Sequence, residues 1–448
     1  MLDQMFTAET FRVIFDEENR KGYDPAGRFF PSVEPYTEAV KSKIHEIRKI
    51  NGNAAALPNL DLESAIDIAK NDLKKLKLDR SAVIDAELRT VSSNAAKSSF
   101  RITLKKKVGP KGKPIYVSDD SPESYFVIKQ VQRNIKRIYA VKQSNRNEMA
   151  AQVARTLSTD FPFEVVRTDI RTFYESVDRK KLIRKIDDDQ LLSTVSKNYI
   201  KQTLDAYGVL SGSAKGIPRG IGLSAFLGEL ALRPVDNQIR SLPGVVLYCR
   251  YVDDILAVFA RPVTGKEVGS YQDLVVKGVE KCGLTTNPDK TQSLVLGSSK
   301  PAKFTYLGYR FAVDSKGCSI RPSATKFLKY KRRVQASFEQ YDRDIHVSAK
   351  KAYRNLVARV RFLTTNARLL NNKASATVGI YYGNPLVNDL VTFRRLDKML
   401  KKRVEGIRRK ALRNRLKLLT FTNGFVNRPY SNFTTQELSR ITKAWRDE

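Results

Sequence analysis

Two adjacent aspartates lie between two runs of residues that are suited to buried strands. The stretch VVLYCRYVDDILAVFA, residues 245–260, places Asp253 and Asp254 between these runs. The β-branched and aromatic residues on either side predict two strands, and Val252 with the acid pair fits a tight hairpin turn. Taken alone, this stretch is equally compatible with acids that merely form a turn and with acids that serve a function.

A second apolar run also ends in an acid. The stretch FEVVRTDIRTFYESVD, residues 163–178, contains a run that ends at Asp169, as a core strand would. Two core strands that each present an acid at one end favour carboxylates that converge on a divalent cation. Mg²⁺ takes oxygen ligands at about 2.0 to 2.1 Å and bridges carboxylates and substrate phosphates. The sequence therefore predicts a metal-dependent site for phosphoryl transfer at these strand ends.

The composition points to a folded protein with a polyanionic partner. The chain has 448 residues, of which 41% are hydrophobic, so it is long enough for two to four domains. Its formal charge of +34 favours nucleic acid as the partner, because Lys and Arg that neutralise phosphates release counterions. An anionic membrane surface is the alternative. Since no apolar run approaches the ~18 residues of a membrane span and the N-terminus lacks a signal-peptide core, we expect a cytoplasmic protein with no membrane partner.

Cysteine and histidine are scarce. The three cysteines are scattered, and the two histidines, His45 and His346, are isolated. This pattern suggests neither a disulfide framework nor a zinc cluster. It also argues against a Ser-His triad and against a His-dependent hydrolase or nuclease.

The segments on either side of the acids differ in character. Residues 1–95 read as helical, interrupted by the loop INGNAAALPNLDL, and carry no assignable chemistry. From Ser98, SFRITLKKKVGPKGKPIYVS predicts a cationic hairpin, with an edge strand protected by lysines as the alternative. Residues 321–448 contain 30 Lys and Arg against 9 Asp and Glu, with apolar residues at steps of three and four. This predicts basic amphipathic helices, although a solvated helix face would have the same pattern.

Five motifs occur in an order that resembles the palm motifs of reverse transcriptases. They are DIRTFY, GIPRGIGLSAFLGELAL, YVDD, GLTTNPDKT and FTYLGYRF, within roughly residues 98–311. The resemblance is strongest to the bacterial defence-associated or abortive-infection enzymes, which are related to retron and group II intron enzymes. It implies an α+β right-hand polymerase with fingers, a palm containing an antiparallel sheet, and a helical thumb. The implied boundaries are 1–95 for a helical N-terminal extension, 96–165 for the fingers, 166–300 for the palm with a helical insertion at about 179–215, 301–320 for the primer-grip hairpin and 321–448 for the basic thumb.

The resemblance also assigns the catalytic residues. Asp169, Asp253 and Asp254 would be the catalytic acids and metal ligands, with Asp254 in the lesser, supporting part. Ile170 would offer its backbone carbonyl to a metal. Lys290 would protonate the pyrophosphate leaving group, and a plain surface lysine is the alternative. The implied cofactor is a pair of Mg²⁺ ions, which Mn²⁺ could replace.

The same resemblance implies contacts to the nucleotide and the primer. Tyr174 matches an aromatic steric gate that clashes with a 2′-hydroxyl, with a core tyrosine as the alternative. Many reverse transcriptases have Gln where this chain has Arg219, and this departure leaves template reading open. The implied nucleotide-binding residues are Lys113, Arg146, Tyr174, Pro218, Arg219 and Gly220, and the implied primer grip is Tyr306, Leu307 and Gly308.

By resemblance, the expected function is RNA-directed DNA synthesis in bacterial antiviral defence. The expected partners are an RNA template in the form of a structured non-coding RNA, a DNA primer or product, dNTPs, and either a second defence protein or further copies of the chain. An RNA-directed RNA polymerase is one alternative, and Tyr174 argues against it. A non-catalytic RNA-binding scaffold is another, which the three intact acids disfavour because desolvated charges are costly to keep.

Overall fold

The chain forms two compact units. The computed structural model describes residues 3–52, 59–142, 145–159, 161–262, 269–296, 302–315, 317–369 and 376–445. Unit 1 comprises residues 1–142 and 172–232, and unit 2 comprises residues 143–171 and 233–448. Helix α10 (Gly222–Arg240) begins in a segment of unit 1 and ends in a segment of unit 2.

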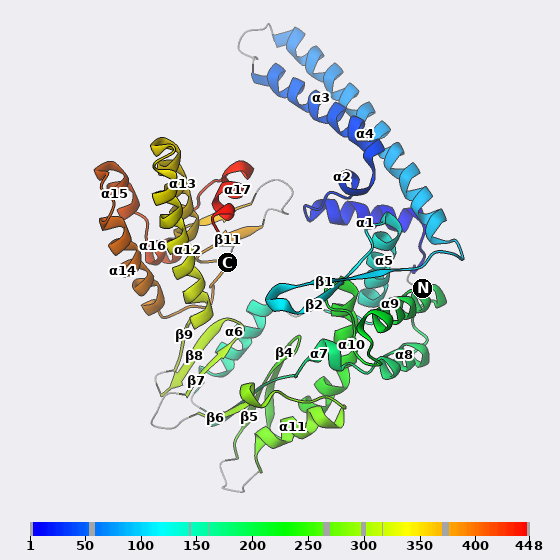
Figure 1. Cartoon of the computed structure of the whole chain (residues 1–448), viewed down its shortest axis with the longest axis vertical. Helices are drawn as coiled ribbons and strands as arrows, with labels where there is room; N and C mark the ends of the chain where they lie inside the picture. The colour runs from blue at the N-terminus through cyan, green and yellow to red at the C-terminus, as the bar shows by residue number, and fades with distance from the viewer. Residues whose placement is uncertain are drawn as a thin grey trace. The chain divides into compact units, whose positions relative to one another are not determined.

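Unit 1 begins with helices, as the sequence predicts. Helices α3 (Glu34–Gly52) and α4 (Asn59–Ala95) pack along each other as a long pair (Figure 1). Of the predicted loop between them, residues 53–58 lie outside the described residues. The aromatic rings of Phe11 and Phe126, 5.5 Å apart, pack the first helix against the fifth. The other helices of this unit are α1 (Ala8–Arg20), α2 (Pro25–Phe29), η1 (Pro31–Val33), α5 (Pro122–Ile138), α7 (Phe173–Ser176), α8 (Arg179–Asp188) and α9 (Thr194–Ser211).

The predicted cationic hairpin is confirmed in unit 1. Strands β1 (Leu104–Val108) and β2 (Pro114–Ser118) pair antiparallel, with Lys106 opposite Tyr116. The turn between them is a short 3-10 segment, η3 (Pro110–Gly112). All residues of β1 except the first are exposed, so the lysines of this strand face solvent within unit 1.

A four-stranded antiparallel sheet is the centre of unit 2. Its strand order is β4-β5-β3-β6. The side chains of residues 255–259 in β5 are fully buried, which agrees with the apolar run ILAVF. Helix α11 (Tyr271–Lys281) packs on β3 and β6, and α6 (Arg146–Thr156) packs on β4. The strands are β3 (Phe163–Asp169), β4 (Val245–Tyr251), β5 (Asp254–Ala260) and β6 (Gln292–Val295).

A second, three-stranded sheet follows in unit 2. Strands β7 (Ala302–Tyr306), β8 (Tyr309–Asp314) and β9 (Gly317–Pro322) form an antiparallel meander. The rings of Phe304 and Phe311 stack with their centroids 5.0 Å apart. Both rings belong to one buried apolar cluster that also contains residues of the first sheet and of the C-terminal helices.

The C-terminal part of unit 2 is helical, as predicted from its periodicity. The apolar residues Leu396, Leu400 and Val404 of α14 are buried. Near Gly406 the backbone leaves the helix, so α14 and α15 are separate helices rather than one continuous one. Figure 1 shows α14 and α15 beside α12 and α13, which they contact. The elements are α12 (Ala324–Asp344), α13 (Ala349–Thr364), β10 (Asn366–Arg368), β11 (Thr377–Gly379), α14 (Val391–Glu405), α15 (Lys410–Lys417), α16 (Phe421–Val426) and α17 (Thr435–Lys443).

Helices and antiparallel strands together confirm the predicted α+β class. Over the described part of the chain, the helices that are long enough to span a bilayer are not apolar enough to do so.

Candidate active site

The three predicted acids lie at one end of the four-stranded sheet. The register places Asp169, the last residue of β3, opposite Asp254, the first residue of β5. The amide of Ile170 donates a hydrogen bond to the carbonyl of Asp253, with a distance of 3.0 Å. Because the two strands are antiparallel neighbours, this register brings the backbones of all three acids to the same end of the sheet.

The turn that carries Asp253 has a strained backbone. Strand β4 ends at Tyr251 and β5 begins at Asp254, so Val252 and Asp253 form the tip. Val252 has a φ of 59°, in the left-handed region that a β-branched residue rarely adopts. Such a conformation costs on the order of 1 to 3 kcal/mol and persists only where surrounding contacts hold it.

Arg250 supplies one of these contacts. Its Nη1 donates to the carbonyl of Val252 at 3.0 Å, so its guanidinium ties strand β4 to the tip of the turn. The arginine is only 6% exposed. Its Nε and Nη2 bind the two carboxylate oxygens of Asp236 on α10, at 2.6 and 2.8 Å. The hydroxyl of Tyr248 donates to the same carboxylate at 2.7 Å.

Sequence reasoning did not identify Arg250 or Asp236 as functional. The available signal was an arginine inside the otherwise apolar strand VVLYCRY. A buried charge needs a partner, but the sequence does not say that the partner is on α10.

Asp254 is paired with a cation of the same sheet. Arg167 on β3 donates from Nε to Oδ1 and from Nη2 to Oδ2 of Asp254, at 3.1 and 3.2 Å. Burial raises the pKa of Asp254, whereas Arg167 acts to lower it. Both oxygens of this carboxylate are therefore engaged by a planar, bidentate partner.

Asp253 has different surroundings. Its side chain makes no ion pair with any residue that the structure describes. Burial, and then the nearby charge of Asp169, raise the pKa of Asp253 above its ordinary value. Lys290 acts in the opposite direction but does not reverse the shift. A carboxylate that is desolvated beside a second acid favours a bound cation.

Lys290 lies against Asp169. Its Nζ is 2.7 Å from Oδ2 of Asp169. The lysine closes a short 3-10 turn, η4 (Pro288–Lys290), that Asn287 caps through its side chain. The amide of Asn287 also donates to the carbonyl of Asp169 at 2.7 Å, so the segment NPDK is bonded to the end of β3.

The residues present fit a divalent cation held by two side chains rather than three. Nowhere in the described ranges do three His, Cys, Asp or Glu side chains gather closely enough to hold a metal ion. Arg167 engages both oxygens of Asp254, whereas Lys290 engages only Oδ2 of Asp169, so Asp169 and Asp253 keep carboxylate oxygens for a cation. Mg²⁺ is commonly bound through one or two carboxylates, with waters and substrate phosphates completing its shell. The donor set of this site therefore suits Mg²⁺.

The predicted primer-grip residues form the tight turn between β7 and β8. Leu307 and Gly308 have φ values of 46° and 78°, which is the pattern of a type I′ hairpin. A side chain at Gly308 would come within 3.0 Å of both Arg146 and Lys326. Arg146 donates from Nε to the carbonyl of Leu307 at 2.9 Å. The structure thus brings Arg146, one of the predicted nucleotide-binding residues, to this turn of unit 2.

The other predicted nucleotide-binding residues lie in unit 1. The guanidinium of Arg219 lies 5.1 Å from the centre of the Tyr174 ring and forms an ion pair with Glu175 at 3.2 Å. The carbonyl of Arg219 accepts a hydrogen bond of 2.6 Å from the amide of Tyr116, which bonds the loop to β2. Gly220 has a φ of 110°, and a side chain there would come within 2.7 Å of the carbonyl of Tyr116.

Pro218 and Lys113 complete this set. The carbonyl of Pro218 accepts a hydrogen bond of 2.6 Å from the Ser224 hydroxyl. Lys113 follows the hairpin turn and is exposed within unit 1. Tyr174, Arg219 and Gly220 therefore lie in one cluster beside β2, joined to it through the carbonyl of Arg219, and Lys113 lies next to the turn of the same hairpin.

Comparison with known proteins gives one family match. Residues 127–311 match the family model described as "Reverse transcriptase (RNA-dependent DNA polymerase)". This range includes Asp169, Asp253, Asp254 and Lys290. None of the curated proteins compared with this chain matches it.

Two telomerases are among the similar solved structures. Telomerase from Candida albicans, in complex with a TWJ fragment of telomeric RNA, is 11% identical with a TM-score of 0.38, and the match covers 73% of this chain and 68% of that one. Apo telomerase from Candida tropicalis is 13% identical with a TM-score of 0.40, covering 78% of this chain and 62% of that one. The segment that matches the reverse transcriptase family model, residues 127–311, thus contains the end of the antiparallel sheet at which the three acids lie, within a chain of α+β class.

Proposed function

We propose that this protein adds dNTPs to the 3′ end of a primer, copying RNA, by phosphoryl transfer assisted by two divalent metal ions. The observation that carries the proposal is the pair of acids Asp169 and Asp253. They lie at one end of the sheet, and the pKa of Asp253 is raised by burial and by the charge of Asp169. Such a pair is costly in the absence of a cation and gains stability when a cation binds.

In the proposed reaction, the primer 3′-oxygen forms a bond to the α-phosphorus of a dNTP while the bond to the bridging oxygen breaks and pyrophosphate leaves. Two Mg²⁺ ions, or Mn²⁺ in their place, would stabilise the attacking and leaving oxygens. Asp169 and Asp253 would hold the ions, with the carbonyl of Ile170 as a further ligand. Asp254 would support Asp169 and Asp253 through its ion pair with Arg167, which keeps this guanidinium at the same end of the sheet.

Lys290 is proposed to donate a proton to the departing pyrophosphate. Its ammonium group is held at the sheet end by Asp169 and remains about half exposed, so a phosphate can reach it. Tyr174 and Arg219 are proposed to contact the sugar and the templating or incoming base. Arg146 and the turn Leu307–Gly308 are proposed to position the primer.

Primer extension tests the proposed chemistry. Purified protein, Mg²⁺, a primed RNA template and labelled dNTPs should give labelled product, and Asp253→Asn should reduce the rate at least about a thousandfold. Asp273→Asn is a matched control, because Asp273 is an exposed acid on α11 of the same unit. Its rate should stay within about twofold of the parent. Full activity of Asp253→Asn would refute the assignment.

Sugar selection is tested at Tyr174. If this ring excludes a 2′-hydroxyl, Tyr174→Ala should raise incorporation of NTPs relative to dNTPs by about tenfold or more. The ratio is measured in single-nucleotide extension with each nucleotide in turn. Tyr174→Phe keeps the ring and should retain the preference for dNTPs. A parent enzyme that prefers NTPs would instead identify an RNA-directed RNA polymerase.

We also propose a role in bacterial antiviral defence with a dedicated structured non-coding RNA, acting with a second protein or with further copies of the chain. This proposal rests on the resemblance of the five motifs to defence-associated reverse transcriptases and on the charge of +34. Sequencing of the RNA and DNA that co-purify with the protein tests it. One defined RNA with a matching cDNA is expected, and random cellular RNA would contradict it.

A further inference from the structure

A small cavity in the C-terminal helices is lined mainly by arginines. It has a volume of about 330 Å³ and lies among α13, α15 and α17 of unit 2. This volume is at the lower end of the range of ~300 to 1,000 Å³ that is usual for small-molecule sites. The charged residues of its lining are Arg354, Arg359, Arg361, Arg415, Glu437 and Arg440.

Arg359 is a buried cation in this lining. The residue is only 4% exposed, and two nearby residues of the same helix, Leu356 and Val360, are buried apolar residues. Neither Nε nor Nη1 of Arg359 has a hydrogen-bond partner among the described residues. Burial is the largest influence on this guanidinium and lowers its pKa, although the charge of Asp344 acts in the opposite direction. A buried, unpaired guanidinium is costly, so its retention requires a reason.

The acid in the lining does not neutralise these cations. The carboxylate of Glu437 accepts hydrogen bonds from the amide and the hydroxyl of Thr434, at 2.9 and 3.3 Å, and so caps the start of α17. Arg440 donates from Nε only to the carbonyl of Gln436, at 3.3 Å. The described lining therefore contains five arginines and one carboxylate.

We propose that this cavity binds a compact di- or triphosphate group, carried by a free nucleotide or by the 5′ end of an RNA. Guanidinium groups match the geometry of phosphate oxygens and bind them through paired hydrogen bonds. A di- or triphosphate carries its charges on adjacent phosphorus atoms, whereas a nucleic-acid backbone has one charge per nucleotide. Five arginines around one small cavity suit the denser charge, and Arg359 adds a desolvated positive charge to the wall of this cavity.

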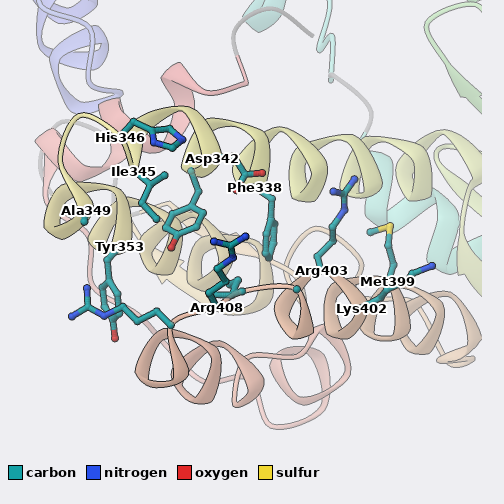
Figure 2. Close-up of a pocket in the computed structure, with 14 residues that line it drawn as sticks. Phe338, Asp342, Ile345, His346, Ala349, Tyr353, Met399, Lys402, Arg403 and Arg408 are labelled. Atoms are coloured by element: carbon teal, nitrogen blue, oxygen red, sulfur yellow. The ribbon is translucent and has the colours of Figure 1, made fainter.

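A neighbouring cavity provides the control. It has a volume of about 940 Å³ and lies between α12 and the end of α14 (Figure 2). Its lining contains the aromatic rings of Phe338 and Tyr353, and an acid, Asp342. Its cations, including Arg403, are exposed. Arg403→Gln therefore removes the same charge as a substitution in the arginine cavity without removing a buried, unpaired guanidinium.

Calorimetric titration of the full chain with inorganic tripolyphosphate, in EDTA, tests the proposal. We expect Arg359→Met to weaken binding by about tenfold or more, and Arg415→Gln, at an exposed arginine of the same lining, to weaken it about threefold. Arg403→Gln should stay within about twofold of the parent. The three substituted arginines lie outside the proposed polymerase site, and EDTA removes the metal ions of that site, so differences between these variants do not depend on the proposed polymerase function. Equal effects of the Arg403 and Arg415 variants would overturn the proposal, since they would indicate general charge attraction.

The unfolding temperature gives a second test of the proposal. An arginine with only a structural role would not give the changes in unfolding temperature that are expected here. Without phosphate, Arg359→Met should unfold at a higher temperature than the parent, because a buried unpaired charge is replaced by an apolar side chain. With tripolyphosphate, the parent should gain stability and the variant should not. A variant that is less stable than the parent without phosphate would show that Arg359 is satisfied within the fold, and this outcome would overturn the proposal. If this variant does not fold, that too overturns the proposal.

Two further titrations distinguish the sources of the phosphate. ATP and dATP represent free nucleotides, and a short RNA with a 5′-triphosphate, compared with the same RNA with a 5′-hydroxyl, represents an RNA end. The cavity is assigned to an RNA end if the parent binds the 5′-triphosphate RNA about tenfold more tightly than the 5′-hydroxyl RNA and Arg359→Met abolishes this preference. Binding of ATP or dATP that shows the same dependence on Arg359 assigns it to a nucleotide. If none of these ligands shows that dependence, the proposal is overturned.

Discussion

Asp253 and Asp254 occupy consecutive positions, yet their carboxylates have different partners. Asp254 is held by Arg167 through two hydrogen bonds. Asp253 has no ion-pair partner among the described residues and lies close enough to Asp169 for that charge to raise its pKa. At the scale of single residues, the site therefore combines one neutralised acid with one acid that favours an added cation.

The raised pKa of Asp253 predicts a pH-dependent cost to stability. The folded state holds the proton of Asp253 more tightly than the unfolded chain does. The free energy of unfolding therefore falls as the pH rises from 3.8, the ordinary pKa of an aspartate, to the raised pKa of Asp253 in the folded state. Asp253→Asn should therefore raise the unfolding temperature by about 2 °C at pH 7.5 in EDTA, and this gain should vanish near pH 4. Thermal unfolding with and without Mg²⁺ measures both effects.

Mg²⁺ should stabilise the parent, and this gain should be lost in the variant. Asp273→Asn, at an exposed acid, serves as the control. An Asp253→Asn protein that is less stable than the parent in EDTA at pH 7.5 would contradict the prediction.

Tyr306 carries a buried hydroxyl without a partner. The residue is fully buried on β7, and its hydroxyl makes no hydrogen bond to a described residue. Leaving a buried donor unsatisfied costs on the order of 1 to 3 kcal/mol. Tyr306→Phe should therefore keep the free energy of unfolding unchanged or raise it by about 1 kcal/mol, as measured by urea denaturation. A loss of more than about 1 kcal/mol would show that the hydroxyl is satisfied.

At the scale of elements, the acidic hairpin depends on a buried ion pair between a strand and a helix. Arg250 on β4 and Asp236 on α10 make two hydrogen bonds, with side chains only 5% and 13% exposed. Arg250 also binds the carbonyl of Val252, the residue with a positive φ at the tip. The ion pair therefore stabilises the helix–sheet packing and positions the turn.

Removing one partner of this pair should be strongly destabilising. Asp236→Asn leaves Arg250 buried beside a neutral group, and the expected loss is about 3 to 5 kcal/mol in the free energy of unfolding. The double variant Asp236→Leu with Arg250→Met removes both charges and should recover most of that stability. Urea denaturation measures both.

Activity separates packing from positioning. The double variant lacks the hydrogen bond to the carbonyl of Val252, so primer extension should remain at least about tenfold slower than in the parent even where stability is recovered. Restored activity in the double variant would show that Arg250 contributes only to packing.

The helical and β elements could be predicted to different extents from the sequence. The hairpin of residues 104–118 and the strand that ends at Asp169 were predictable, because alternation and Gly-Pro turns are local patterns. The third strand of the β7-β8-β9 sheet was not predicted, since only its first two strands carried a recognised motif. The boundary between α14 and α15 near Gly406 could not be predicted, because the apolar spacing continues across it.

At the scale of the whole molecule, positive charge dominates. The net charge is +34, and residues 321–448 hold 30 Lys and Arg against 9 Asp and Glu. Most acids of the described ion pairs lie outside this segment. This excess favours binding to a nucleic-acid backbone without sequence preference.

Binding to nucleic acid should therefore depend steeply on salt. A primed RNA template should bind about a thousandfold more weakly at 200 mM than at 50 mM monovalent salt, which corresponds to roughly six phosphate contacts. Fluorescence anisotropy across the salt series measures the slope, with an uncharged peptide nucleic acid of the same sequence as the control. Affinity that hardly changes with salt would contradict a binding mode based on the charge of the chain.

The sequence by itself determined the hairpin of residues 104–118, the amphipathic pattern of the C-terminal helices and the presence of acids at the ends of two core strands, because periodicity and turn composition act over a few residues. Only the tertiary structure decided which cation meets which acid. Arg167 and Asp254 are 87 positions apart, and Lys290 and Asp169 are 121 apart. Their pairing follows from strand register and burial, which depend on the packing of the whole sheet. The same holds for Arg359, whose burial without a partner has no local signature in the sequence.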